Sequence, residues 1–306
     1  MNNARRTLGV RLAPDGNNIA EVTFLRERVN NWADRIRTGH LPRRLVWESM
    51  QTTITKSIQY PLPATTLTEA QCRWIMAPLL AHGLSGIGVV RTMKRDVVYG
   101  PVKYQGLGLS CLFTFQMTEH IVRILKYCTA NNNITGQLIQ HTLEATKLEV
   151  GCEGPLMGKV YSTYKDLVTP TWLTHTWEFL GENNMQIEDN VEDLTLEREN
   201  DQFLIRAFQQ VGYKGKILGQ LNACQMFLNI TTVADMATGC GKYVTQSAWT
   251  GNTDNTRYRR YDWPNQGQPT HSDWILWQEA VSRALCDRPQ VLRKRLGRWL
   301  YKSKTH

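Results

Sequence analysis

Apolar residues recur at helical spacing near the start of the chain, and this pattern restricts the fold more than any other feature of the sequence. Between residues 19 and 37 they lie three or four positions apart, at Ile19, Val22, Leu25, Val29, Trp32 and Ile36. Such a stripe is typical of an amphipathic helix that buries one face. A second stripe covers residues 45–58 and stops at Tyr60-Pro-Leu-Pro63, because two prolines cannot continue a helix. We predict two helices, the first closed by Gly39, with a basic turn between them.

A third helix and a strand complete the first predicted unit. Thr66-Leu-Thr-Glu69 has the Thr-x-x-Glu form of a capping box, which predicts a helix start. Pro78 falls late in this helix and is expected to kink it or to end it early. Upstream, residues 7–16 alternate apolar with small or polar residues and end in a turn signature, which predicts one strand followed by a bend. A lone strand at this end would leave an unpaired edge.

The rest of the chain predicts further helices around one β-rich segment. Residues 97–109 favour a hairpin or an irregular extended segment around Gly100-Pro101. Helical spacing returns over residues 117–128, 134–148, 203–211, 217–228 and 274–285; the expected turns and caps are Asn131–Asn133, Gly212, Thr231-Thr232 and Ser272. By composition, residues 245–272 are the least ordered part. The predicted fold class is mainly α with minor β, a helical bundle followed by further helical units and a short hairpin or extended segment.

Composition and charge suggest three segments with different partners. The chain has 306 residues, 42% of them hydrophobic, which is enough to bury a core and fold. We expect a strand and helical bundle over residues 1–95, a middle helical unit over 96–180, and an acidic linker, helical unit and basic tail over 181–306. Residues 182–202 carry eight acidic side chains against one arginine, whereas residues 287–306 carry seven basic side chains against one aspartate. The net charge of +9 favours a polyanionic partner, and a solvated basic tail without a ligand is the alternative.

What the sequence lacks argues against several classes of site. The seven cysteines are an odd number without any C-x-x-C, which fits neither a disulfide framework nor a paired-thiolate zinc site. No G-x-x-x-x-G-K-[ST], no H-E-x-x-H and no Asp-Asp pair occurs. We therefore expect no catalysis by the chain on its own, no cofactor, no metal and no small-molecule substrate. Since no run of about 18 apolar residues and no signal-peptide apolar region occurs, we expect an intracellular protein, nuclear or cytoplasmic, without a membrane partner.

Basic residues gather at three places that are candidates for binding nucleic acid. They are Arg35, Arg37, Arg43 and Arg44 in the turn between the first two helices, Lys94, Arg95, Lys103 and Tyr104 around the glycine-rich segment, and Arg293, Lys294, Arg295 and Arg298 near the C-terminus. Guanidinium groups suit bidentate contact with phosphate, and an exposed tyrosine suits stacking on a base. The alternatives are ordinary surface charge for the first set and a tight turn with a core tyrosine for the second. For the third set they are a packed terminal helix or a nuclear-targeting signal.

A series of short motifs accompanies these basic residues. They are Leu8-Gly-Val10 with Pro14-Asp-Gly16, Trp32, the segment 47–56, Tyr60-Pro-Leu-Pro63, and Tyr99-Gly-Pro101 with Gly106-Leu-Gly108; looser ones are Trp263-Pro264, Trp274, Trp277 and Leu296-Gly-Arg-Trp299. Over residues 7–150 the chain resembles the thumb and downstream region of non-LTR-type retroelement reverse transcriptases. The looser motifs resemble the C-terminal region of algal-type retroelement open reading frames.

The resemblance implies a palm-edge strand and a thumb-like helical bundle that grips the template–primer backbone. The positions that match this grip are Arg35, Arg37, Arg43, Arg44 and Lys56. The fingers, the palm and the paired catalytic aspartates would all precede Met1, so polymerase activity does not carry over to this chain. We therefore predict non-catalytic binding of RNA or RNA/DNA backbone by a separated C-terminal part of an RNA-directed DNA polymerase, with an upstream polymerase domain as a second partner. The alternatives are an inactive, degenerate retroelement fragment and a helical protein-interaction module.

Overall fold

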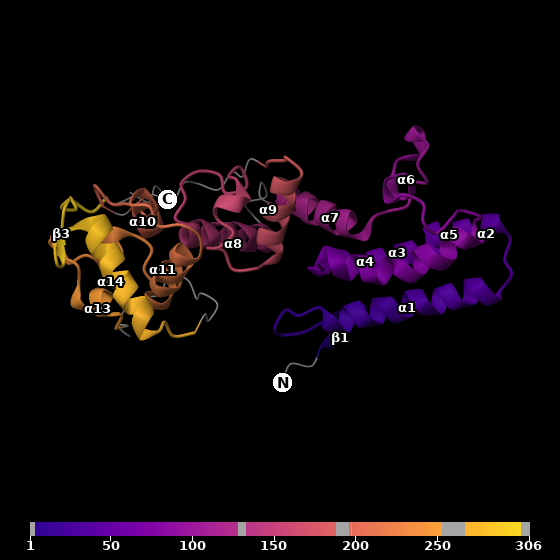
Figure 1. Ribbon diagram of the computed structural model, residues 1–306, viewed down its shortest axis with the longest axis horizontal. Helices are drawn as coiled ribbons and strands as arrows, with labels where there is room; N and C mark the ends of the chain where they lie inside the picture. The colour runs from indigo at the N-terminus through magenta and orange to yellow at the C-terminus, as the bar shows by residue number, and fades with distance from the viewer. Residues whose placement is uncertain (1–3, 128–132, 188–195, 197, 253–266, 301–306) are drawn as a thin grey trace. The chain divides into compact units, whose positions relative to one another are not determined.

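The computed structural model describes residues 4–127, 133–187, 196, 198–252 and 267–300. This part of the chain is mainly helical, and its strands form two small antiparallel pairs, β1–β2 and β3–β4 (Figure 1). The predicted fold class is therefore confirmed. The chain divides into two compact units, residues 1–125 and 126–306. The segment boundaries that we expected after residues 95 and 180 fall inside these units.

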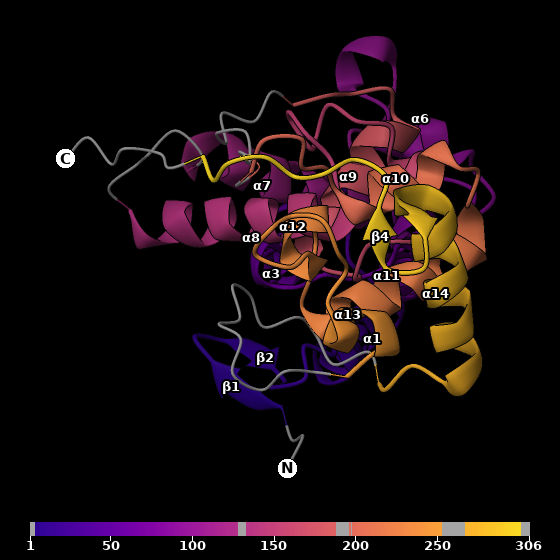
Figure 2. The same cartoon turned by 90° about the vertical axis from the view of Figure 1, so that its left-hand side faces the viewer.

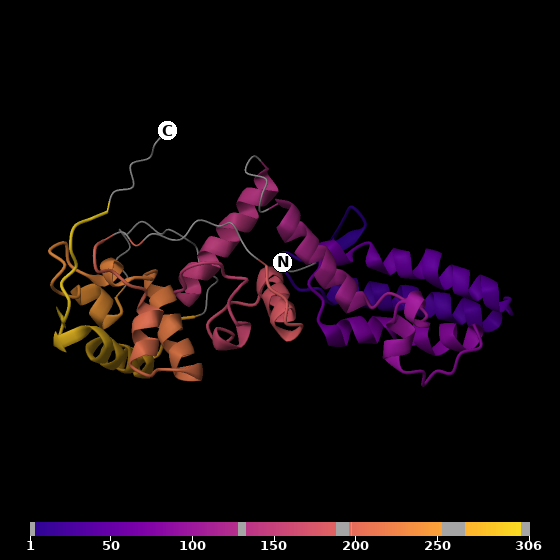
Figure 3. The same ribbon diagram turned by 90° about the horizontal axis from the view of Figure 1, so that it is seen from above.

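Three helical paths make up the bundle of the first unit. They are α1 (Ile19–Thr38); the run α2 (Arg43–Glu48), η1 (Ser49–Ile54) and α3 (Thr55–Gln59); and the run α4 (Glu69–Pro78), η3 (Leu79–Gly83) and α5 (Leu84–Gly86). The first two match the predicted helices, and the second ends before Pro61 as expected. The segments η1 and η3 are π-helical, so each run continues as one helix. Figures 1 and 3 show α1 running beside α4.

The three paths enclose one apolar core, and two glycines set how closely the second and third paths approach. Its fully buried members include Leu25, Val29, Met50, Ile54, Ile58, Ile75, Met76 and Leu79. A Cβ atom placed on Gly83 would lie 2.7 Å from Met50 Sδ, and one on Gly86 would lie 2.9 Å from Val46 Cγ1. Since the core is close-packed, a side chain at either glycine would force Met50 or Val46 to shift.

Both ends of α4 differ from the prediction. Its capping box is formed by Thr68 with Gln71, two residues later than the expected pair. At the other end Pro78 lies inside the helix, and the path continues into η3 where an early end was expected. Proline has no N–H, so it leaves the carbonyl of Trp74 without its helical donor. The Arg26 guanidinium of α1 donates to that carbonyl and lies 4.8 Å from the Trp74 ring centre, which offsets the missing bond.

The predicted lone strand is one arm of a hairpin, so the expected unpaired terminal strand is wrong. Strands β1 (Arg5–Thr7) and β2 (Val10–Leu12) pair in antiparallel register around Leu8 and Gly9, whose φ angles are 48° and 91° (Figure 2). Two positive φ angles are the signature of a tight two-residue hairpin turn. The Tyr60 hydroxyl donates to the Leu8 carbonyl at 2.8 Å, which holds the turn against the end of α3.

The glycine-rich segment is extended at Gly100-Pro101, as one of the two expectations had it, but it has helical turns on either side and, within this described part of the chain, no strand. It contains α6 (Arg95–Tyr99) and a 3-10 turn, η4 (Val102–Tyr104). The N–H groups of Leu107 and Leu109 donate to the carbonyls of Val97 and Val98 at 2.8 and 3.1 Å, and these bonds close the base of the segment. Figure 1 shows the segment projecting from the bundle. The chain then enters α7 (Leu112–Tyr127), at whose end the second unit begins.

The second unit is also helical, with a two-stranded ribbon after its last helix. Its elements are α8 (Ile134–Val150), a 3-10 turn η5 (Tyr161–Thr163), α9 (Trp172–Glu182), α10 (Leu204–Gln210), α11 (Gly215–Leu228), α12 (Val233–Met236), α13 (Gln246–Thr250), α14 (His271–Leu285), β3 (Cys286–Arg288) and β4 (Val291–Leu292). Helix α14 packs against α10 and α11 through Trp277, which is fully buried and lies 5.6 Å from the Phe208 ring. The Trp277 indole N–H donates to the Ala248 carbonyl at 2.9 Å, so α13 is fixed to the same core.

Several expectations for the second unit need correction. Helix α14 is capped by Thr270 with Asp273, not by Ser272, whereas Thr232 caps α12 as predicted. Of the acidic stretch expected to be a linker or a solvated face, Asp201 is 8% exposed and accepts from the Ala234 N–H at 2.9 Å. Helix α13 lies in the part expected to be least ordered. Residues 253–266 of that part, which include Trp263-Pro264, lie outside the described residues, as do most of the acidic stretch and most of the Asn131–Asn133 turn.

None of the helices in the described part of the chain combines the length and the apolar character that crossing a bilayer requires.

A buried carboxylate makes the second unit sensitive to pH. Glu149, near the end of α8, is 4% exposed, and its Oε1 accepts from the Thr169 N–H at 2.8 Å and the Thr169 hydroxyl at 2.7 Å. Burial raises the pKa of Glu149 from 4.5 to about 7, although the two hydrogen bonds act in the opposite direction. The folded state therefore binds one more proton than the unfolded state between these two values.

We predict that stability falls as pH rises from 4.5 through 7 and that Glu149→Gln removes this fall. The pKa difference corresponds to a loss on the order of 3 kcal/mol in the free energy of unfolding. Urea unfolding across this pH range measures it, with the exposed Glu182→Gln as control. Parallel curves for the wild type and Glu149→Gln would show that the buried carboxylate is not the cause.

We also predict that Gly86→Val destabilises the first unit by about 1–3 kcal/mol, because its side chain must overlap Val46. Circular dichroism during urea unfolding gives the value. The matched control is Gly239→Val, at an exposed glycine with no atom within 4 Å of a Cβ placed on it. Equal midpoints for the two variants would contradict the close approach of the helical runs.

Candidate nucleic-acid interface

Almost all of the net charge belongs to the first unit. Residues 1–125 contain 16 Arg and Lys against eight Asp and Glu, a net charge of +8, whereas residues 126–306 contain 20 against 19, a net charge of +1. One of the eight acids, Glu21, is buried and accepts from the Arg11 N–H at 2.7 Å. The first unit therefore carries a surplus of positive charge that the second unit lacks.

The sharpest concentration of this charge is the turn between α1 and α2, which we call the arginine corner. It consists of Arg35 and Arg37 in the last turn of α1 and Arg43 and Arg44 in the first turn of α2. Local sequence explains the turn: the Gly39 N–H donates to the Arg35 carbonyl at 2.9 Å, which closes α1, and Pro42 immediately precedes α2. Four arginines within ten residues are thereby brought to one end of the bundle.

Three of the four arginines at this corner have no acidic partner among the described residues. Arg37 lies 3.5 Å from the Asp34 carboxylate, and both side chains are exposed, so this pair contributes little. Arg35, Arg43 and Arg44 are exposed, and no described carboxylate lies within 4 Å of them. The Arg43 guanidinium packs over the backbone of Gly88, where a Cβ would lie 2.9 Å from its Cζ. The corner therefore presents guanidinium groups whose hydrogen-bond donors are available to phosphate.

Lys56 is not part of this corner. It lies on α3, exposed, 13 positions after Arg43 along the same helical run. At about 1.5 Å per residue the two are separated by roughly 20 Å along the helix. Lys56 can contact a bound polymer only if that polymer extends along the second helical path.

The second predicted set lies on the projecting segment. Lys94 precedes α6, Arg95 begins it, and Lys103 and Tyr104 belong to η4. Tyr104 is 72% exposed, which excludes the alternative of a core tyrosine, and Lys103 Nζ lies 4.7 Å from its ring centre. A cation therefore covers one part of the ring while the rest stays open for stacking.

The third predicted set is exposed at the surface of the second unit, and three of its four members make contacts within that unit. The chain there is not helical: Arg293 lies 3.1 Å from the Asp287 carboxylate, and Arg295 donates to the Cys240 carbonyl at 3.0 Å. Arg298 lies 3.9 Å from Glu199. Lys294 is exposed, and no ion pair to a described carboxylate involves it.

Arg198 explains why this terminal segment is fixed. Its side chain is 4% exposed, and its guanidinium donates to the carbonyls of Gly297 at 2.8 Å and Thr238 at 3.4 Å. Both acceptors are backbone groups far along the chain, so the sequence gives no signal of the pairing. The segment that ends at Trp299 is thereby held against the body of the unit, with a bridge between Arg198 and Trp299.

Sequence reasoning missed other basic residues of the first unit. Arg91 is exposed, and its Nε donates to the Ser85 hydroxyl at 2.9 Å, close in sequence to the Gly88 that underlies Arg43. Arg5 and Arg6 are exposed on β1. Arg91 belongs to a short basic run with Lys94 and Arg95, and that run is the signal that identifies it.

No group of three or more His, Cys, Asp and Glu side chains is placed to hold a metal ion in the part of the chain that the structure describes. The chain matches no protein-family model, no curated protein and no solved structure. The similarity to retroelement reverse transcriptases therefore stays a prediction, and the case for a function depends on the geometry and charge of the first unit.

Proposed function

We propose that the first unit binds the sugar–phosphate backbone of RNA or of an RNA/DNA duplex without acting on it chemically. The observation that supports this most is the arginine corner, at which Arg35, Arg43 and Arg44 are exposed and lack a described acidic partner. In this proposal the chain acts as a separated C-terminal part of a reverse transcriptase. Its bundle then grips the polymer that an upstream polymerase domain copies.

Phosphate is the ligand that suits these groups best. Each guanidinium offers a planar fork of donors that matches two phosphate oxygens, and no internal ion pair has to be broken first. The surrounding excess of positive charge attracts a polyanion and releases its condensed counterions on binding. Backbone contacts carry no base information, so affinity depends strongly on salt and only slightly on sequence.

One observation favours a second candidate. Leu41 and Leu45, at the same turn, are 43% and 46% exposed, so the corner also presents apolar surface. A helical protein partner with an acidic, apolar face would use both features. Such binding buries apolar area and depends less on salt, which separates it from phosphate binding.

We predict that Arg35→Gln, Arg43→Gln and Arg44→Gln together weaken binding of a short RNA/DNA hybrid by about tenfold or more. The slope of log K against log salt should become shallower by about 2–3, because each lost phosphate contact removes about 0.7–0.9 from it. Fluorescence anisotropy of the labelled hybrid at several salt concentrations measures both quantities.

The matched control removes the same charge from exposed positions of the second unit, through Lys214→Gln, Lys216→Gln and Arg288→Gln. It should leave the affinity within about twofold and the slope unchanged. If both triple variants weaken binding equally, net charge alone is responsible and the corner has no special role. If the wild type fails to bind the hybrid at low salt, the proposal is wrong and the fragment or protein-partner alternatives stand.

A further inference from the structure

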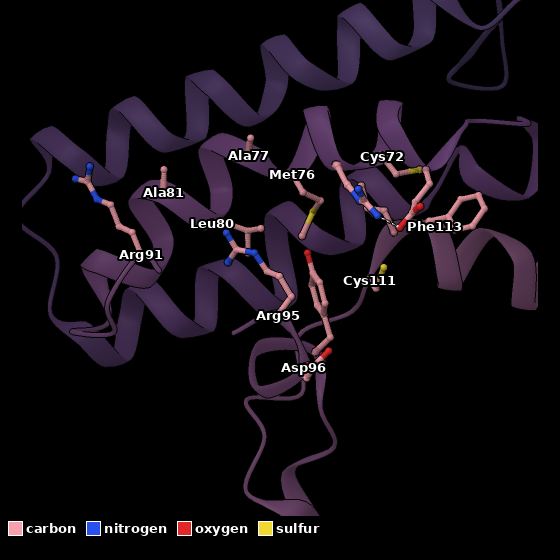
Figure 4. Close-up of a pocket in the computed structure, with 14 residues that line it drawn as sticks. Cys72, Met76, Ala77, Leu80, Ala81, Arg91, Arg95, Asp96, Cys111 and Phe113 are labelled. Carbon is pink, nitrogen blue, oxygen red and sulfur yellow. Dashed lines mark hydrogen bonds and ion pairs between the residues drawn. The ribbon is translucent and has the colours of Figure 1, made fainter. Parts of the chain in front are cut away.

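A pocket opens in the first unit on the side of α4 that faces the α6 segment and the start of α7. Its volume is about 710 Å³, within the range of roughly 300–1,000 Å³ that is typical of small-molecule sites. Figure 4 shows side chains from α4, from the segment of Arg91 to Asp96, and from Cys111 and Phe113 around it. We call it the α4 pocket. It is separate from the arginine corner in its lining residues.

One wall of the α4 pocket is apolar. Cys72 and Met76 are each 2% exposed and Leu80 is 7% exposed, with Phe113 nearby in the lining. Burial raises the pKa of the Cys72 thiol to about 12 and also raises the pKa of Tyr99, another lining residue. Both shifts have the same cause, since the wall offers little solvation to a charge. A flat or aliphatic group fits this wall better than a polar one.

The end of the pocket near Leu80 and Ala81 carries cations that are not neutralised. Arg73 pairs with Glu69, so that pair adds no net charge. Arg91 is fixed by the bond from its Nε to Ser85 Oγ, which leaves its two terminal amino groups, and Figure 4 shows the Arg95 guanidinium beside Leu80. No described carboxylate lies within 4 Å of the Arg91 or Arg95 guanidinium, although Asp96 also lines the pocket.

We propose that the α4 pocket binds a small amphipathic anion, with its apolar body on Met76 and Leu80 and its anionic head at Arg95, toward the end of the pocket that Arg91 also lines. Phosphate and carboxylate heads share this chemistry, so a nucleoside monophosphate and a medium-chain fatty acid are the two sources to be distinguished. Arg91 and Arg95 outnumber the one unpaired carboxylate of the described lining, Asp96, so the pocket favours a ligand with negative charge. The site does not depend on the proposed function of the arginine corner.

The test compares two dyes that differ by one sulfonate group. The probe 8-anilinonaphthalene-1-sulfonate has an apolar body and an anionic head, and N-phenyl-1-naphthylamine is the same body without the head. We expect the anionic dye to bind the full chain with one-to-one stoichiometry and about tenfold or more tightly than the neutral dye. Equal affinities would overturn the proposal, because the arginines would then contribute nothing.

Occupancy of the site can be read independently at Cys111, which lines the pocket and is partly exposed. Alkylation by iodoacetamide, followed by mass spectrometry of each cysteine peptide, should slow at Cys111 when the anionic dye is bound. The exposed Cys240, in the second unit, is the internal control and should react at an unchanged rate. If the dye binds and the rate at Cys111 does not change, the dye lies elsewhere and the proposal fails.

Two variants separate the contribution of the anionic head to the affinity from that of the apolar body. Arg91→Gln with Arg95→Gln should weaken the anionic dye by about tenfold and leave the neutral dye within about twofold. Ala77→Trp, at an exposed lining position, should block both dyes while it keeps every charge. An unchanged affinity in either variant would contradict the assignment. Because Ala77→Trp retains the arginine corner, its hybrid binding should match the wild type, so the two proposals fail separately.

Displacement identifies the source of the ligand. Adenosine monophosphate should displace the anionic dye if the pocket serves nucleotides, and decanoate should displace it if the pocket serves acyl chains. Either result supports an amphipathic anion and assigns its class. Failure of both to displace the dye would overturn the proposal.

Discussion

The close approach of two helical runs at Gly83 and Gly86 is the contact on which the first unit depends. With no side chains on these glycines, Met50 and Val46 of the second run pack directly against the backbone of the third. That packing fixes the start of α2 beside the turn that follows α5, where the Arg43 guanidinium covers Gly88. The position of the arginine corner is therefore a consequence of core packing, and a bulky residue at either glycine would move the corner as well as weaken the core.

Positive charge is distributed unevenly between the two units. The first unit holds almost the whole excess of positive charge, although several of its guanidinium groups also make internal contacts: Arg26 replaces the donor that Pro78 lacks, Arg73 pairs with Glu69, and Arg91 donates to Ser85. In the second unit the basic residues near the C-terminus bond to Asp287 and to backbone carbonyls. The exposed arginines of the two units thus differ: three of the four at the corner lack an acidic partner among the described residues, whereas Arg293, Arg295 and Arg298 contact groups of their own unit.

Sequence alone predicts the helices well because their burial is periodic, and Val22, Leu25 and Val29 occupy the core as their spacing requires. It also finds the arginine corner, because a glycine and a proline mark the turn. It fails where the partner is distant: Arg198 is buried against Gly297, and the hairpin needs the residues before Thr7 as its second strand. It fails again at α6, where turn residues such as Gly100-Pro101 suit both a hairpin and a short helix. The α4 pocket has no sequence signal, since its walls come from three separate elements.

Arginine modification of the full chain in the presence of nucleic acid tests the central claim most directly. Phenylglyoxal reacts with exposed guanidinium groups, and peptide mass spectrometry resolves each one. With a saturating RNA/DNA hybrid the account predicts protection of Arg35, Arg43 and Arg44, and unchanged reactivity of the exposed Arg288 and Arg298 of the second unit. Protection confined to Arg288 and Arg298, or equal reactivity of the corner with and without the hybrid, would contradict it.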